Sequence, residues 1–101
     1  MQIPEHLKKD KYWRSLLYLF VNNFTLQFYL NETYFDLEGG VIKVTALKKV
    51  SKPWSQSEKF MLHLALHLFS QSMAKVNLSD MEYLDSKNKA LVHEALKIRF
   101  G

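Results

Sequence analysis

The hydrophobic residues of this chain change their spacing between Phe24 and Leu47. Within that segment they alternate with polar residues, whereas before and after it they recur every three or four positions. Alternation is typical of a half-buried β-strand, and the longer period is typical of a helix with one apolar face. The pair Gly39-Gly40 divides the alternating segment, and consecutive glycines are typical of two-residue hairpin turns because they accept a positive φ. The spacing therefore predicts an antiparallel sheet in the middle of the chain, with helices before and after it.

A two-residue turn at the glycine pair fixes which residues of the two flanking strands face one another. It places Asp36 opposite Lys43 and Leu37 opposite Ile42, with the apolar pair on one face and the oppositely charged pair on the other. A second two-residue turn at Asn31-Glu32 puts the apolar residues of the preceding segment on the same face. Because both turns give one apolar face, we predict a three-stranded antiparallel meander over residues 24–47.

Helical spacing covers three other stretches, from about Pro4 to Asn22, from about Gln56 to Met73, and from Asp85 or Ser86 to about Arg99. The second stretch begins with Ser55-Gln56-Ser57-Glu58, a capping box in which the serine and glutamate side chains each bond a backbone N–H group. A short helical turn is expected around Ser79 to Leu84. The predicted order is α-β-β-β-α-α, an α+β fold with helices packed on one face of the sheet.

The length and composition predict one domain over residues 1–101. Hydrophobic residues make up 48% of the chain and charged residues 24%, which favours a globular core over disorder. Cysteine is absent, which excludes disulfides, thiol nucleophiles and thiolate zinc sites. The first residues do not resemble a secretory signal, and no apolar run approaches the ~20 residues that a membrane span needs. We therefore expect a cytoplasmic protein that does not contact a membrane.

The pair most suggestive of metal chemistry is His63 and His67. Two histidines four positions apart on a helix can bind one metal ion, but Leu64 stands where zinc proteases have a glutamate, and the spacing fixes no third ligand. We interpret the pair as the polar edge of a central helix that buries Leu64, Leu68 and Phe69. We predict no metal and no cofactor, and keep a metal-dependent activity at the pair as a second alternative.

No constellation of catalytic residues is present. The chain has no nucleophile motif of the G-x-S-x-G type, and its glycine pair lies between predicted strands rather than before a helix, where it could hold a phosphate. Asp36 and Glu38 are predicted to lie on the outer face of the sheet beside Lys43, where charges are usually solvated. We therefore expect a protein that is not an enzyme.

The leading hypothesis is a small non-catalytic interaction module of the accessory, regulatory or inhibitor type. A domain of this size has difficulty covering the wide apolar arc of its second helix, and an uncovered patch favours association with a protein partner or with a second copy, as a homodimer. Tyr29 and Tyr34 are predicted neighbours on the outer face of the sheet, and Trp54 lies just before the second helix. These aromatic residues are the candidate protein-interaction site.

The alternative hypothesis is a nucleic-acid-binding module. The net charge is +4, and the candidate contacts are the lysines Lys48, Lys49, Lys52, Lys8, Lys9 and Lys11. Ten acidic residues are interspersed with the basic ones. A few dispersed lysines give weak, sequence-independent binding that salt removes by competing for the phosphates. We therefore favour a protein partner over a nucleic acid.

Overall fold

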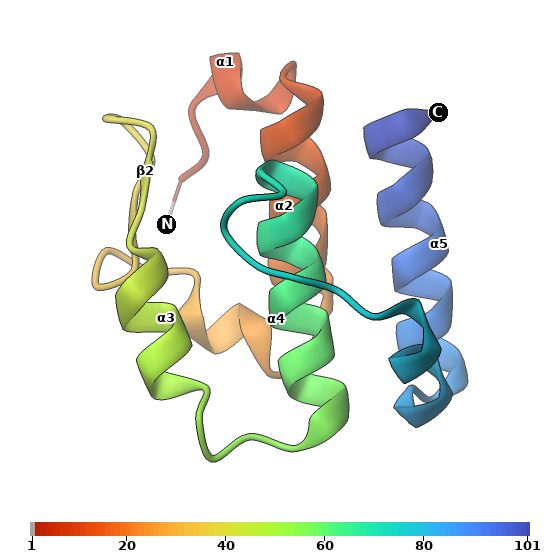
Figure 1. Ribbon diagram of the computed structural model, residues 1–101. Helices are drawn as coiled ribbons and strands as arrows, with labels where there is room; N and C mark the ends of the chain where they lie inside the picture. Colours follow the sequence, from red (N-terminus) through yellow and green to blue (C-terminus); the bar gives the residue numbers. More distant parts are fainter. Residues whose placement is uncertain (1) are drawn as a thin grey trace.

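Helices account for most of the chain in the computed structural model, which describes residues 2–101 (Figure 1). Two short strands pair into a small antiparallel sheet, so the fold mixes helix and strand as predicted, but in other proportions. In chain order the elements are α1 (Glu5–Lys8), α2 (Lys11–Asn22), the 3-10 helix η1 (Leu26–Tyr29), β1 (Phe35–Asp36), β2 (Val41–Ile42), α3 (Val44–Val50), α4 (Gln56–Phe69), the 3-10 helix η2 (Leu78–Tyr83) and α5 (Ser86–Phe100).

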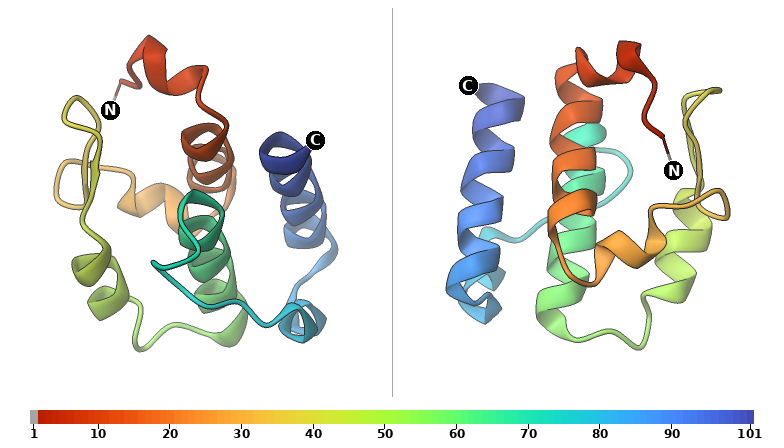
Figure 2. Two further views of the ribbon diagram at one scale, coloured as in Figure 1. Left: turned by 45° about the horizontal axis from the view of Figure 1, so that its top comes forward. Right: turned by 180° about the vertical axis from the view of Figure 1, so that it is seen from behind.

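The three long helices α2, α4 and α5 form the core. α2 packs against both α4 and α5 and runs antiparallel to each, whereas α4 and α5 touch one another less (Figures 1 and 2). Leu16, Leu19 and Phe20 of α2 are fully buried. Since these residues recur every three or four positions, they line the faces of α2 that meet its two neighbours.

The predicted helix from Pro4 to Asn22 is divided in two. α1 ends at Lys8, and Asp10 caps the start of α2 with its side chain, whose Oδ1 accepts from the backbone N–H groups of Tyr12 at 2.8 Å and Trp13 at 3.2 Å. An aspartate at this position satisfies N–H groups that the helix itself leaves unpaired. The prediction of one continuous helix was wrong, although its end at Asn22 is confirmed.

The three-stranded meander was wrong, and its first predicted strand is the 3-10 helix η1 instead. Asn23 is the cause, because its Oδ1 accepts from the backbone N–H groups of Thr25 at 3.0 Å and Leu26 at 2.9 Å. An asparagine that bonds the backbone after it stabilises a turn in place of a strand. Leu26 then points inward, while Phe24 and Phe28, expected on the same buried face, point outward.

The last predicted strand is also cut short, since α3 begins at Val44. The segment that follows β2 is rich in residues with a high helix propensity, and Leu47 on the inner side of α3 is fully buried. Leu47 is the side chain by which this short helix reaches the core.

The predicted register of the hairpin was wrong by two residues. Asp36 lies opposite Val41, not Lys43, and Phe35 lies opposite Ile42. Asp36 Oδ1 accepts from the backbone N–H of Gly39 at 3.0 Å, which holds a loop of four residues rather than two. A shift of two residues preserves the alternation of sides, so Phe35 and Ile42 are buried on one face as predicted.

The prediction for α4 is confirmed at its start. Glu58 Oε1 accepts from the backbone N–H of Ser55 at 3.0 Å, and Ser55 Oγ accepts from that of Glu58 at 3.3 Å, which completes the capping box. The helix ends at Phe69 rather than near Met73. The helical turn expected near Ser79 is η2, and Asp85 caps α5 by accepting from the N–H of Asn88 at 2.8 Å.

The core position of α4 predicts a large cost for truncating Leu68, which is 3% exposed. We expect Leu68→Ala to lower the free energy of unfolding by about 2–5 kcal/mol, because it removes buried methyl groups and leaves a cavity. Val21→Ala is the control, because Val21 is 49% exposed on α2, and it should change stability by less than about 0.5 kcal/mol. Urea unfolding measures both. Equal effects of the two substitutions would contradict the assignment of α4 to the core.

Candidate functional site

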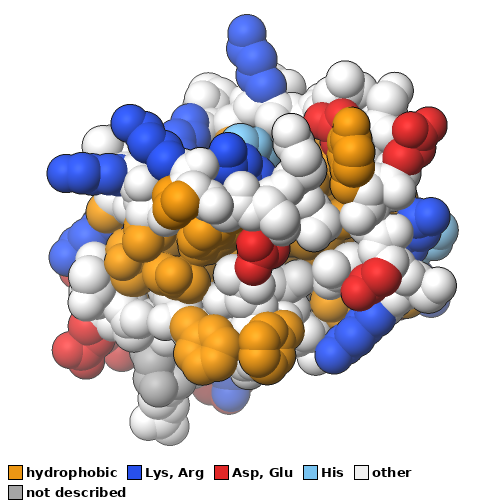
Figure 3. All heavy atoms as spheres, turned by 90° about the horizontal axis from the view of Figure 1, so that it is seen from below, with side chains coloured by type: hydrophobic (Ala, Val, Ile, Leu, Met, Phe, Trp, Pro, Cys, Tyr) orange, Lys and Arg blue, Asp and Glu red, His pale blue; other side chains and the backbone are white. Residues whose placement is uncertain are grey.

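Five aromatic side chains lie on η1 and on segments near it, in two groups of touching rings, and together we call them the aromatic surface: Phe24, Phe28, Tyr29, Tyr34 and Trp54. The rings of Phe24 and Phe28 meet edge to face with their centroids 5.6 Å apart, although the two residues are 73% and 64% exposed. Tyr29, which follows Phe28 in the chain, lies 5.4 Å from the ring of Tyr34 and 5.0 Å from that of Trp54. Figure 3 looks at this end of the molecule and shows hydrophobic side chains gathered on it.

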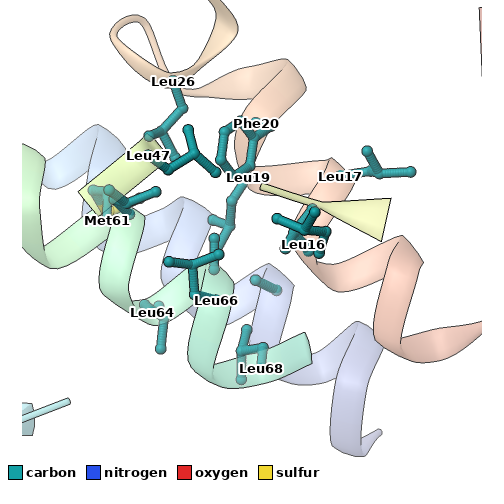
Figure 4. Packing of buried hydrophobic residues seen from close by; sticks show 14 of the residues in the cluster. Leu16, Leu17, Leu19, Phe20, Leu26, Leu47, Met61, Leu64, Leu66 and Leu68 are labelled. Carbon is teal, nitrogen blue, oxygen red and sulfur yellow. The ribbon is translucent and has the colours of Figure 1, made fainter. Parts of the chain in front are cut away.

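The aromatic surface is held in place from beneath. Leu26 of η1 and Leu47 of α3 both point into the core beside Met61 of α4 (Figure 4). Thr25 Oγ1 donates to Glu58 Oε2 at 2.7 Å, which ties the start of η1 to the capping box of α4. These contacts fix the position of η1, the segment on which Phe28 and Tyr29 lie.

The structure brings together the three aromatic residues that the sequence singled out. Tyr29 and Tyr34 are neighbours as predicted, but across the turn at residues 30–33 rather than across a sheet. Sequence reasoning missed Phe24 and Phe28, which the alternating pattern assigned to a buried face. The signal that could have identified them is Asn23, because asparagine directly before an apolar alternation favours a turn.

The two lysine groups that the sequence proposed for nucleic acid do not form one surface. Lys48, Lys49 and Lys52 belong to α3 and the residues after it, beside the aromatic surface, and α1 with its lysines lies at the other end of the molecule (Figures 1 and 2). Lys11 instead lines a shallow hollow of about 560 Å³ with basic residues of α2 and α5. Arg99, at that hollow, donates through Nε to Leu68 O at 2.9 Å and stacks on the Tyr12 ring at 4.0 Å, so it has a structural role.

His63 and His67 lie at the edge of α4, half-buried, as predicted. His67 Nδ1 lies 2.9 Å from Ala74 O and therefore donates to it, because a carbonyl oxygen can only accept. This bond holds the segment after α4 against the helix. Over residues 2–101 no cluster of three His, Asp or Glu side chains is arranged to hold a metal ion. The pair has no visible third ligand in that range.

Comparison of the chain with family models, with curated proteins and with solved structures found no match. None of the helices in the described part of the chain has the length and apolar character needed to span a bilayer.

The hydrogen bond between Thr25 and Glu58 lowers the pKa of the Glu58 carboxyl, and the two bonds from Ser55 lower it further. A carboxyl with a lowered pKa stabilises the fold at neutral pH, and that contribution is lost as the pH falls through its pKa in the folded state. We expect Thr25→Val to raise the pKa of Glu58, as followed by NMR of the side-chain carboxyl. Thr33→Val is the control, since Thr33 lies in an exposed turn away from Glu58. The free energy of unfolding that Thr25→Val removes should be larger at pH 7, where the Glu58 carboxyl is ionised, than at pH 3.

Burial lowers the pKa of His63, and the positive charges of Lys48 and Lys59 lower it further. This histidine therefore binds a proton more readily in the unfolded chain than in the folded chain. As the pH falls below the ordinary pKa of histidine, His63 lowers the stability of the fold. We expect Lys59→Gln to raise the pKa of His63 in an NMR titration, because it removes one like charge. Lys9→Gln, at the far end of the molecule, should leave it unchanged; an unchanged value in both variants would contradict the role of Lys59.

Proposed function

We propose that this chain is a non-catalytic interaction module that binds a protein partner or a second copy through the aromatic surface. The observation that carries the proposal is the pair of phenylalanines in contact with one another yet about two-thirds exposed, Phe24 at 73% and Phe28 at 64%. Scattered single apolar side chains are normal on a protein surface, whereas a contiguous aromatic patch is typical of a binding site.

The free energy needed to bind a partner requires the whole aromatic surface and not the two phenylalanines alone. Burying one Phe side chain stabilises a complex by about 1.5–3 kcal/mol. Association costs an estimated 4–15 kcal/mol in lost freedom of motion, so two rings, at about 3–6 kcal/mol together, offset only the lower part of that range. The half-buried Tyr29, Tyr34 and Trp54 extend the contact, and aromatic side chains of these types carry much of the energy of known interfaces.

Nucleic acid remains the second candidate, for one specific reason. Exposed aromatic rings beside lysines are also the means by which single strands are bound, through stacking and phosphate contacts. Lys48, Lys49 and Lys52 lie beside the aromatic surface, but the second lysine group lies too far away to extend the contact. We expect single-stranded RNA and DNA to bind weakly and to be released near ~150 mM salt.

The test of the proposal is selection of random peptides displayed on phage against the immobilised chain. We expect the selected peptides, resynthesised, to lose about tenfold or more in affinity for Phe24→Ser/Phe28→Ser, because the central rings of their contact are removed. Phe100→Ser is the matched control, because Phe100 is 70% exposed at the end of α5, outside the aromatic surface. Peptides that bind the double variant as tightly as the original chain, with both variants folded by circular dichroism, would contradict the proposal.

A further inference from the structure

A second surface of this chain carries acidic and exposed apolar side chains, which are complementary to the rings of the aromatic surface and to the lysines beside it. Three acidic side chains lie on η2 and just after it: Asp80 and Glu82 belong to η2, and Asp85 caps α5. The same segment exposes large apolar side chains, since Leu78 is 63% exposed and Tyr83 is 59% exposed. It is thus an acidic and apolar surface, which we call the acidic surface.

The acidic and aromatic surfaces lie at the same end of the molecule. Figure 1 shows α3 on one side of that end and the segment of η2 on the other, with the connection from α3 to α4 between them, and both views of Figure 2 agree. Seen from that end, lysine side chains and the hydrophobic patch gather on one half, with some acidic side chains at its edge, and acidic and basic side chains are interspersed on the other half (Figure 3).

Neither set of charges takes part in an ion pair within the described residues. Within residues 2–101 the one ion pair joins Lys8 to Glu5 at 3.3 Å, so Lys48, Lys49 and Lys52 pair with no carboxylate. Asp80, Glu82 and Asp85 likewise form no ion pair in that range, although Asp85 caps α5 and Asp80 lines a hollow with Lys59 and Lys75. Charges left unpaired on two halves of one face are available to a partner of the opposite pattern.

We propose that the aromatic surface binds the acidic surface of a second copy of this chain in a two-fold symmetric dimer. The inference rests on the proposed function and names its partner. A two-fold axis lying in the contact plane places each half of one copy against the opposite half of the other, so every contact forms twice. Lysines then face carboxylates on both sides of the axis, and the exposed rings of one copy meet Leu78 and Tyr83 of the other.

The energetics and the area are compatible with this dimer. A standard interface buries about 800 Å² per partner, which is about an eighth of the 6172 Å² that the chain exposes. Each chain has a net charge of +4, so the copies repel at long range, but salt screens that repulsion beyond about 8 Å. Because charge attraction and apolar burial both contribute, raising the salt should weaken the dimer without abolishing it.

The experiment is sedimentation velocity of the full chain over a concentration series from ~1 to ~500 μM. We expect the mass of a dimer at the upper end of the series, and the mass of a monomer for Phe24→Ser/Phe28→Ser. A chain that stays monomeric throughout overturns the proposal. If peptides are still captured at the phenylalanine pair of such a monomer, the proposed function stands and only the second copy is excluded as the partner.

Charge reversal tests the pairing of the two surfaces. Lys48→Glu/Lys49→Glu/Lys52→Glu and Asp80→Lys/Glu82→Lys should each be monomeric alone, because like charges then face one another across the axis. Asp85 is left unchanged because it caps α5. Mixed in equal amounts, the two variants should recover the dimer as a heterodimer, because both contacts become complementary again. Lys9→Glu/Lys11→Glu, which reverses lysines at the other end of the molecule, should keep the dimer. A mixture that stays monomeric, with both variants folded by circular dichroism, overturns the pairing.

Discussion

The packing of α2 against α4 and α5 is the interaction on which the rest of the structure depends. Leu16, Leu19 and Phe20 are fully buried, and the two partner helices make fewer contacts with each other than with α2. The small sheet cannot substitute for this core, because two paired strands of two residues each are marginal on their own. The helices thus form the framework, and the segment from residue 24 to residue 54 is attached to it.

Glu58 connects that framework to the aromatic surface. One oxygen of its carboxylate completes the cap of α4, and the other accepts from Thr25 at the start of η1. A single ionised side chain therefore fixes both the first turn of a core helix and the position of the exposed rings. The arrangement explains how large aromatic side chains stay exposed in a small protein: the backbone that carries them is held by polar contacts as well as by Leu26.

The sequence predicted features that depend on one local pattern. It missed features in which a side chain bonds the backbone and overrides the pattern of apolar residues. The capping box at Ser55 is a local pattern, and it was predicted and is confirmed. The alternation after residue 24 fits a strand equally well until the Asn23 side chain bonds the backbone and selects a turn. The register of the hairpin changed for the same kind of reason, since Asp36 bonds Gly39 and lengthens the loop. Tyr29 and Tyr34 were predicted as neighbours through a strand pairing that is absent, because residues 26–29 form η1. The roles of Lys48 and the other site residues stay predictions.

The shallow attachment of α3 has a consequence for how this chain moves. The helix spans seven residues and contributes one fully buried side chain, Leu47, to the core. An element held by so little buried surface opens at a lower free energy than the long helices, and its amide protons exchange with solvent through that partial opening before the core does. The lysines beside the aromatic surface are therefore carried on a segment that can adjust its position more readily than the long helices. A bound partner that holds this segment in one position reduces its conformational entropy.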